Sequence, residues 1–133
     1  MRLDELKKDL GNDDVKAIKR IIELKYQEKG IEYNIEKTVS NWLDSKPSSI
    51  DRRYRRNCYD FCFALGYDIR RTFEFMLKCF QVIPFYYRTR MDSIYYYCIK
   101  NKRPYSVLKD MMLISETWDK NNKISKTDFI HIA

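Results

Sequence analysis

Residues 52–100 read RRYRRNCYDFCFALGYDIRRTFEFMLKCFQVIPFYYRTRMDSIYYYCIK, and this stretch decides the fold. It holds all four cysteines, six of the seven phenylalanines and eight of the eleven tyrosines. Its apolar side chains recur at spacings of three and four, which is typical of helices that bury one face. The whole chain has only three glycines and three prolines, too few turn residues for a many-stranded sheet. We therefore expect an all-α fold, a compact bundle of five to six helices with no sheet.

Length and composition indicate one folded domain. A chain of 133 residues can bury roughly two-thirds of the surface that its unfolded form exposes. Hydrophobic residues make up 44% of it, a normal share for a globular protein and too high for a disordered one. We expect a single all-helical domain over residues 1–133, with its main helical core in 48–115. The predicted core contains Trp42, Phe61, Leu65, Phe73, Leu77, Tyr95 and Leu108.

Residues that favour helix ends divide the chain into segments. Glycine adopts the left-handed conformation that closes many helices, so we expect helices to end at Gly30 and Gly66. Short polar side chains cap helix N-termini by accepting hydrogen bonds from the first N–H groups. We expect Asn12 or Asp13 to begin the second helix and Asp68 to begin the helix after Gly66.

The cysteines are predicted to be buried thiols in a cytoplasmic protein. No run approaches the ~18 apolar residues of a membrane span, and the first eleven residues, MRLDELKKDLG, are too charged for a secretion signal. Cysteines in the cytoplasm are normally reduced. Cys58, Cys62, Cys79 and Cys98 could in principle hold zinc, but they lie in apolar stretches without Cys-x-x-Cys spacing. Core thiols are therefore favoured, and we expect no metal and no cofactor.

Positive charge is concentrated in the middle of the chain. The formal net charge is +7, and residues 48–103 hold twelve basic and five acidic residues. Residues 1–47 and 104–133 each hold equal numbers of the two kinds. Such a distribution attracts nucleic acid or an acidic protein surface. The alternative is a basic surface that is only solvated.

A predicted helix over residues 50–65 combines arginines with aromatic rings. The side opposite its apolar face carries Arg52, Arg55, Arg56, Tyr59 and Phe63. Guanidinium groups bind phosphate and aromatic rings stack on bases, so this side suits nucleic acid. The alternative is that Tyr59 and Phe63 pack under a neighbouring helix while the arginines extend along its edge.

Residues 34–66 resemble the second half of an XRE-type helix-turn-helix regulator. The matching positions are Val39, Ser40, Trp42, Lys46, Pro47, Ser48, Ala64, Leu65 and Gly66. The helix that normally precedes the recognition helix is shortened here. The resemblance implies that Lys37 and Asn41 contact base edges and that Thr38 contacts phosphate. The alternative is an inherited scaffold helix whose polar face is solvated.

Residues 62–105 resemble a helical module of uncharacterised proteins from Gram-positive gut bacteria, some of which carry an XRE-type helix-turn-helix. The matching residues are Cys62 to Gly66, Thr72, Phe75, Lys78, Pro84, Phe85, Asp92, Tyr95 to Cys98, Asn101 and Tyr105. The resemblance implies a regulatory or interaction role and brings no catalytic residue. The residues agree, because the only histidine, His131, stands near the end of the sequence and no Gly-rich phosphate loop is present. We expect no enzyme.

Two functions remain open. The first is a bacterial regulator that binds DNA, or derives from one that does, through Lys37, Thr38, Asn41, Arg52, Arg53, Arg55, Arg56, Arg88 and Arg90. The second is a protein–protein adaptor or inhibitor, of phage or defence origin, that binds an acidic partner through exposed tyrosines. These are Tyr59, Tyr86, Tyr87, Tyr96 and Tyr97. Tyrosine and arginine suit both kinds of interface, and the sequence leaves the oligomeric state open, a dimer included.

Overall fold

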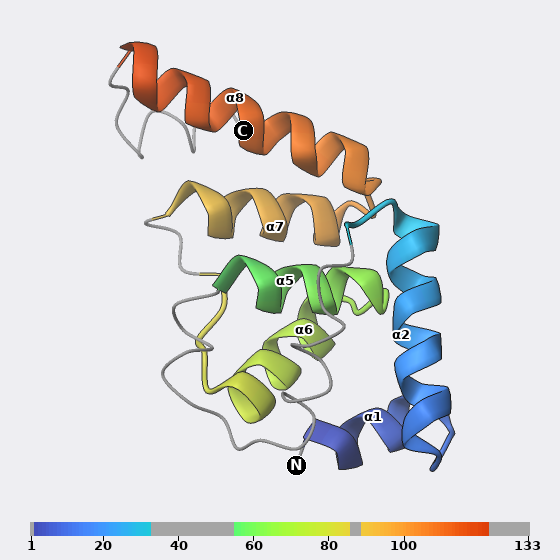
Figure 1. Ribbon diagram of the computed structural model, residues 1–133. Coiled ribbons are helices and arrows are strands. Elements are labelled where there is room, and N and C mark those ends of the chain that lie inside the picture. Colours follow the sequence, from blue (N-terminus) through green and yellow to red (C-terminus); the bar gives the residue numbers. More distant parts are fainter. Residues whose placement is uncertain (1, 33–54, 86–88, 123–133) are drawn as a thin grey trace.

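The structure is a computed structural model of the chain, and it describes residues 2–32, 55–85 and 89–122. Within these ranges the chain forms six helices and no strand, so the predicted all-α class is confirmed (Figure 1). The helices are α1 (Arg2–Leu10), α2 (Val15–Lys29), α5 (Arg55–Ala64), α6 (Ile69–Phe75), α7 (Arg90–Lys100) and α8 (Tyr105–Asn122), and the π-helical turn η1 (Met76–Phe80) continues α6. The predicted helix over 34–47, with Trp42, lies outside the described residues.

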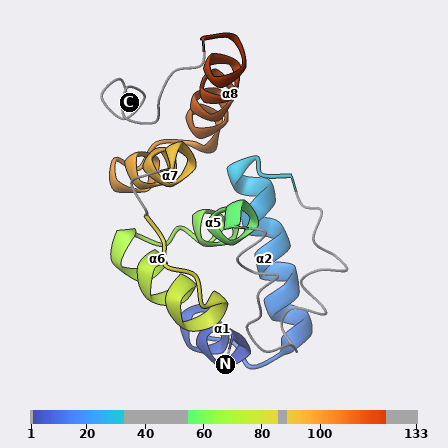
Figure 2. The ribbon, with the colours of Figure 1, turned by 90° about the vertical axis from the view of Figure 1, so that its left-hand side faces the viewer.

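Helix α5 lies at the centre of the described helices. It packs against α2, α6, η1 and α7, while α1 packs on α2 and α8 packs along α7. Figure 1 shows α8, α7, α5 and α6 stacked in that order with α2 running along one side, and Figure 2 shows the same stack after a quarter turn. Because neighbours surround α5, its buried side chains point in almost every direction: Cys58, Tyr59, Phe61, Cys62, Phe63 and Ala64.

The helix ends follow the sequence signals with one correction. Gly30 and Gly66 adopt left-handed conformations, with φ of +71° and +73°, and close α2 and α5 as expected. Asp68 caps α6 by accepting a hydrogen bond from the N–H of Arg71 at 2.7 Å, also as expected. The predicted N-cap of α2, Asn12 or Asp13, is wrong, because Asp14 caps this helix. Asn12 instead shapes the preceding turn, where its side chain accepts a hydrogen bond from the N–H of Asp14.

Helix α7 closes with the same motif but without glycine. The N–H of Arg103 donates to the carbonyl of Cys98 at 2.9 Å, and the N–H of Lys102 donates to the carbonyl of Ile99 at 3.3 Å. These two bonds define a Schellman motif, whose left-handed position is usually glycine. Lys102 holds that position here, with φ of +51°. A side chain with a Cβ is strained in this conformation.

The buried residues form one hydrophobic cluster that extends from Leu6 in α1 to Met112 in α8. Of the predicted core, Phe61, Tyr95 and Leu108 are buried, and Leu65 is half-buried. None of the described helices is long and apolar enough to cross a membrane.

Two predicted core residues lie at the surface. Phe73 is 42% exposed and Leu77 is 46% exposed, so their assignment to the core is wrong. The inward side of α6 and η1 is formed instead by Thr72, Phe75, Met76, Cys79 and Phe80. This segment is apolar on several sides, so periodicity alone does not select the buried one. The wider turn of η1 then changes the direction of the side chains that follow Phe75.

Candidate functional site

Arg55, a predicted phosphate ligand, is bound to a carboxylate inside the protein. Its Nε and Nη2 atoms lie 2.9 and 2.8 Å from Oδ1 of Asp92, which is fully buried in α7. Its Nη2 also donates to the backbone carbonyl of Ile83. A buried carboxylate is costly unless it is paired and hydrogen-bonded. Arg55 therefore compensates Asp92 and joins α5 to α7, and its role as a phosphate ligand has no support in this geometry.

Tyr59, a predicted partner-binding residue, is 0% exposed, and that prediction is wrong. Its hydroxyl donates to Asp92 and accepts a hydrogen bond from the N–H of Phe85 at 2.6 Å. Its ring stacks on that of Tyr95, with centroids 4.6 Å apart. Burial raises the pKa of Tyr59 well above its ordinary value. The alternative in which this tyrosine packs under the neighbouring helix is the one observed, because α7 covers this side of α5.

A second acid, Asp60 of α5, is held among hydroxyl groups. The carboxylate of Asp60 accepts hydrogen bonds from Tyr95 and, at 3.1 Å, from Tyr105. Burial raises the pKa of Asp60, and burial together with Asp60 raises the pKa of Tyr105 to about 12. This cluster ties α5 to α7 and to the start of α8.

The remaining predicted cations divide into three cases. Arg56 is half-exposed, with its Nη1 3.9 Å from Oε1 of Glu116. Arg90 is buried, so its predicted contact with nucleic acid is wrong. The other predicted site residues lie outside the described residues: Lys37, Thr38, Asn41, Arg52, Arg53, Arg88, Tyr86 and Tyr87.

The two other predicted partner-binding tyrosines, Tyr96 and Tyr97, are half-buried. Tyr96 makes an edge-to-face contact with Phe85 at 5.4 Å between ring centroids. On its other side, Nζ of Lys100 lies 5.7 Å from its ring centroid. Tyr96 thus supports the loop before α7 and leaves only part of its ring for a partner.

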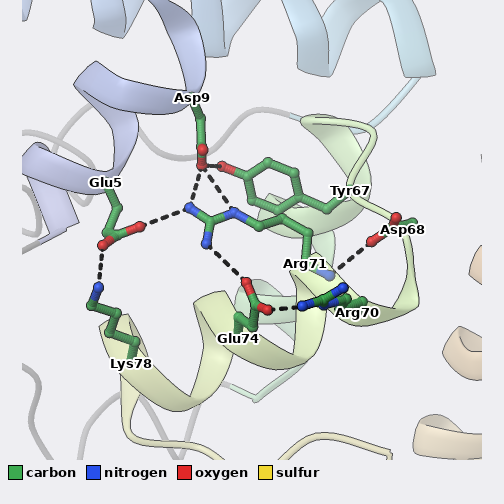
Figure 3. A network of polar contacts seen from close by, with 8 residues as sticks. All are labelled: Glu5, Asp9, Tyr67, Asp68, Arg70, Arg71, Glu74 and Lys78. Atoms are coloured by element: carbon green, nitrogen blue, oxygen red, sulfur yellow. Dashed lines mark hydrogen bonds and ion pairs between the residues drawn. The ribbon is translucent and has the colours of Figure 1, made fainter.

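A network of charged side chains fastens α1 to α6 and η1 (Figure 3). Arg71 lies 2.8 Å from Glu5 and 2.5 Å from Asp9, and Lys78 also bonds Glu5. The hydroxyl of Tyr67 donates to Asp9 at 2.5 Å. The hydrogen bond from Lys78 and the one from Arg71 lower the pKa of Glu5 to about 2. Arg71, like Arg55, therefore stabilises the fold through ion pairs within the protein.

Another group of cations lies in the turn between α7 and α8. Lys100, Lys102 and Arg103 are exposed, and we call residues 100–103 the basic turn. No acidic residue occurs between Asp92 and Asp110 in the sequence. In the described part of the chain, none of these three cations forms an ion pair. The basic turn is therefore a local excess of positive charge open to solvent.

Helix α8, which follows this turn, exposes aliphatic side chains. Leu113 is 62% exposed and Ile114 is 48% exposed. Val107 and Met111 are half-buried. Helix α8 thus presents apolar surface beyond the side that packs on α7.

The four thiols are buried, and none is joined to another. Burial raises the pKa of Cys62 well above its ordinary value and that of Cys98 to about 11. Thiols with raised pKa values are poor nucleophiles and poor metal ligands. Among the described residues, no group of three or more His, Cys, Asp or Glu side chains could hold a metal ion.

The sequence analysis assigned no role to Asp60 or Asp92, the acids on which α5 and α7 depend. Asp60 stands between Tyr59 and Phe61 on the apolar helix α5, and this composition is the signal that could have drawn attention to it. Lys100, Lys102 and Arg103 were likewise not among the predicted site residues. No family model matches the chain, and no curated protein or solved structure is significantly similar to it.

Proposed function

We propose that this chain is a non-enzymatic binding protein that engages an acidic surface of a partner protein through the basic turn and α8. The main observation behind this proposal is that Lys100, Lys102 and Arg103 are exposed and form no ion pair among the described residues. Opposite charges across an interface accelerate association and select the partner. The other function predicted from the sequence is DNA binding. Of the three predicted arginines in the described residues, Arg55 is paired with the buried Asp92 and Arg90 is itself buried, so both are poorly placed for phosphate.

The conformation of Lys102 supports this assignment. Left-handed positions occupied by residues other than glycine are often found at functional sites, because the strain is tolerated for the side chain's sake. Gly30 and Gly66 occupy the equivalent positions in the motifs that close α2 and α5. A lysine at such a position is unfavourable for the fold, and it adds a cation to the basic turn.

The apolar groups exposed on α8 favour a protein partner over nucleic acid. Single-stranded nucleic acid is bound by aromatic rings on which its bases stack. The large apolar side chains that α8 exposes are aliphatic, Leu113 and Ile114. Aliphatic surface rimmed by charge is typical of protein interfaces.

The test compares two polyanions on the full chain at low salt, poly-L-glutamate and a short DNA duplex. A triple variant, Lys100→Glu, Lys102→Glu and Arg103→Glu, should lower affinity for poly-L-glutamate by roughly tenfold or more. The control reverses three other exposed lysines, Lys8→Glu, Lys16→Glu and Lys29→Glu, with the same change in net charge. The control should lose clearly less affinity. Equal losses in the two variants would contradict a specific role for the basic turn.

Nucleic-acid binding is the second candidate, and one observation favours it. Arg56 is half-exposed near the start of α5, directly after the sequence positions of Arg52 and Arg53. Tight duplex binding that falls steeply with salt and is abolished by Arg56→Glu, with no binding of poly-L-glutamate, would establish this function and overturn the first.

A further inference from the structure

Helix α1 is short and buries little apolar surface. It has nine residues, fewer than the roughly 12–15 that an isolated helix needs to persist in water. Among its described side chains only Leu6 is fully buried, and Leu3 and Leu10 are half-buried. It packs on α2 and reaches α6 and η1 through Glu5 and Asp9. An element with so few buried apolar contacts belongs to the least stable part of a fold.

The site that receives α1 is formed by α6 and the residues just before it. The guanidinium group of Arg71 lies over the rings of Tyr67 and Phe75, with its Cζ 5.4 and 5.6 Å from their centroids. These three residues are four positions apart, so the local helical geometry brings them together. Helix α6 is capped by Asp68 and packs against α5 and α7. The position of Arg71 is therefore set without any contribution from α1.

Arg71 is placed to bind two carboxylates from one helix (Figure 3). Glu5 and Asp9 lie one turn apart on α1, and Nη2 of Arg71 lies 2.8 Å from Oε2 of Glu5 and 2.5 Å from Oδ2 of Asp9. Lys78 of η1 bonds the same glutamate, and the hydroxyl of Tyr67 donates to the same aspartate. Guanidinium groups that bind carboxylates in a fixed geometry give specific recognition as well as affinity.

We propose that this face of α6 and η1 binds an acidic helix of a partner protein, and that α1 occupies the site in the free chain as an internal competitor. The sequence that fits the site is an acidic residue, a leucine directly after it and a second acidic residue four positions after the first. In α1 these are Glu5, Leu6 and Asp9, and we call this arrangement the α1 pattern. The inference goes beyond the proposed function, because the site lies on α6 and η1 and not at the basic turn.

Exchange of one acidic helix for another is more favourable than simple release of α1. Among the described residues, Arg71 pairs with Glu5, Asp9 and Glu74, and only Glu74 of its own helix would stay when α1 leaves. The side chain of Arg71 is 23% exposed, and a partly buried charge that loses its partners is costly. An arriving acidic helix replaces the two carboxylates that α1 withdraws.

Charge favours an acidic partner over both α1 and a second copy of the chain. Helix α1 carries three basic and three acidic residues, so it brings no net negative charge to a site that contains Arg71 and Lys78. A helix with a net negative charge adds long-range attraction to the same contacts. Each copy of the chain carries a net charge of +7, so two copies repel each other.

The test measures the binding of two synthetic peptides to the full chain in about 0.15 M salt, where the Debye length is about 8 Å and distant charges are screened. Both peptides are alanine-rich, of identical composition and about 20 residues long, so that both form helix. The first carries the α1 pattern. The second carries its two acidic residues on the side of the helix opposite the leucine. We expect the first peptide to bind at least about fivefold more tightly.

Weakening the internal competitor should strengthen binding of the first peptide. The double variant Glu5→Gln and Asp9→Asn should raise the affinity by roughly tenfold or more over the wild type, because the site is then free in a larger fraction of molecules. The control is Asp13→Asn with Glu28→Gln, which removes two exposed acids and changes the net charge equally. Its affinity should stay within about twofold of the wild type.

Two further substitutions, each added to the double variant, locate the site. Arg71→Gln should lower the affinity for the first peptide by roughly tenfold or more. Lys78→Gln should lower it by about threefold, since one cation is lost. The side chain of Lys78 is 58% exposed, so thermal unfolding should show that this variant folds and tests the site even where Arg71→Gln is unstable. Unchanged affinity in the folded Lys78→Gln variant would overturn the proposal.

Hydrogen exchange reports displacement of α1 directly. Binding of the first peptide to the wild type should accelerate exchange in residues 2–10 and leave α5 and α7 unchanged. Binding that leaves α1 protected would overturn the proposal, as would equal affinity of the wild type and the double variant. Sedimentation equilibrium that shows a dimer of the chain, lost on Arg71→Gln, would assign the site to α1 of a second copy.

The proposed function is tested separately. The triple variant of the basic turn keeps the residues that contact α1, so it should bind the first peptide within about twofold of the wild type in about 0.15 M salt. Failure of the peptide to bind would leave the result with poly-L-glutamate unaffected. Loss of peptide binding in the triple variant equal to that caused by Arg71→Gln would move the site away from α6 and overturn the inference.

Discussion

Helices α5 and α8 both combine cations with apolar side chains, and the structure gives these combinations opposite roles. Helix α5 is covered by neighbours, and its Arg55 compensates the buried acid Asp92. Helix α8 lies at the edge, where the cations of the basic turn have no ion pair among the described residues. The difference teaches that a basic helix indicates a binding surface only when no buried acid requires its cations.

The largest effect is expected from breaking the buried pair on the α5 side. Asp92→Ala removes the counter-charge of Arg55 and the acceptor to which the Tyr59 hydroxyl donates. Losing one member of a buried ion pair costs about 3–5 kcal/mol of unfolding free energy. Urea unfolding measures this cost. Asp110→Ala, which removes an exposed acid from α8, should change stability by no more than about 0.5 kcal/mol. Similar values for the two variants would contradict the comparison.

An intermediate effect is expected at Glu5, whose partners in the network of Figure 3 are only partly buried. Glu5→Gln should cost about 1–2 kcal/mol at pH 7, between the values for surface ion pairs and for hydrogen bonds to charged groups. The pKa of Glu5 falls from 4.5 to about 2 on folding. Its contribution is thus complete above pH 4.5 and is lost as the pH falls toward 2.

Urea midpoints of the wild type and Glu5→Gln at pH 7, 4.5, 3 and 2 test this window. The difference between the two proteins should be constant above pH 4.5 and should shrink below it. A difference that stays constant down to pH 2 would show that the charge of Glu5 does not matter. The contribution of Asp60 to stability depends on pH in the opposite direction. Burial raises the pKa of Asp60, so its ionisation at higher pH destabilises the fold.

The smallest effect concerns the basic turn itself. Lys102→Gly relieves the left-handed conformation at φ of +51° and should stabilise the protein by about 0.5–1 kcal/mol. The same change should weaken binding of poly-L-glutamate, because one of three cations is lost. Gly30→Lys is the reciprocal control, since it places lysine in the equivalent motif at the end of α2. It should destabilise by about 1 kcal/mol. Stabilisation without any loss of binding would remove Lys102 from the site.

Local features of the fold could be predicted from the sequence, because their causes are local. Gly30, Gly66 and Asp68 have conformational and hydrogen-bonding preferences that act within a few residues. The buried positions of Tyr95 and Leu108 follow from the spacing of apolar residues in helices that are amphipathic. Phe73 and Leu77 could not be placed, because their helix is apolar on several sides and its packing partners select the buried one.

The interior arrangement of charge could not be predicted for a different reason. Arg55 meets Asp92 across 37 residues, and Tyr59 meets it across 33. No periodicity within one helix contains that information, since it arises only when α5 and α7 pack together.

The network around Arg71 also bears on the order of folding. Its ion pairs join residues that are 62 to 73 positions apart in the chain. Closing loops of that length costs entropy, and the cost is offset only when both ends are already structured. We therefore expect α1 to dock after α5, α6 and α7 have formed their core. Contacts that form after the transition state slow unfolding and leave the folding rate almost unchanged. The network of Figure 3 should therefore slow the unfolding of the folded chain.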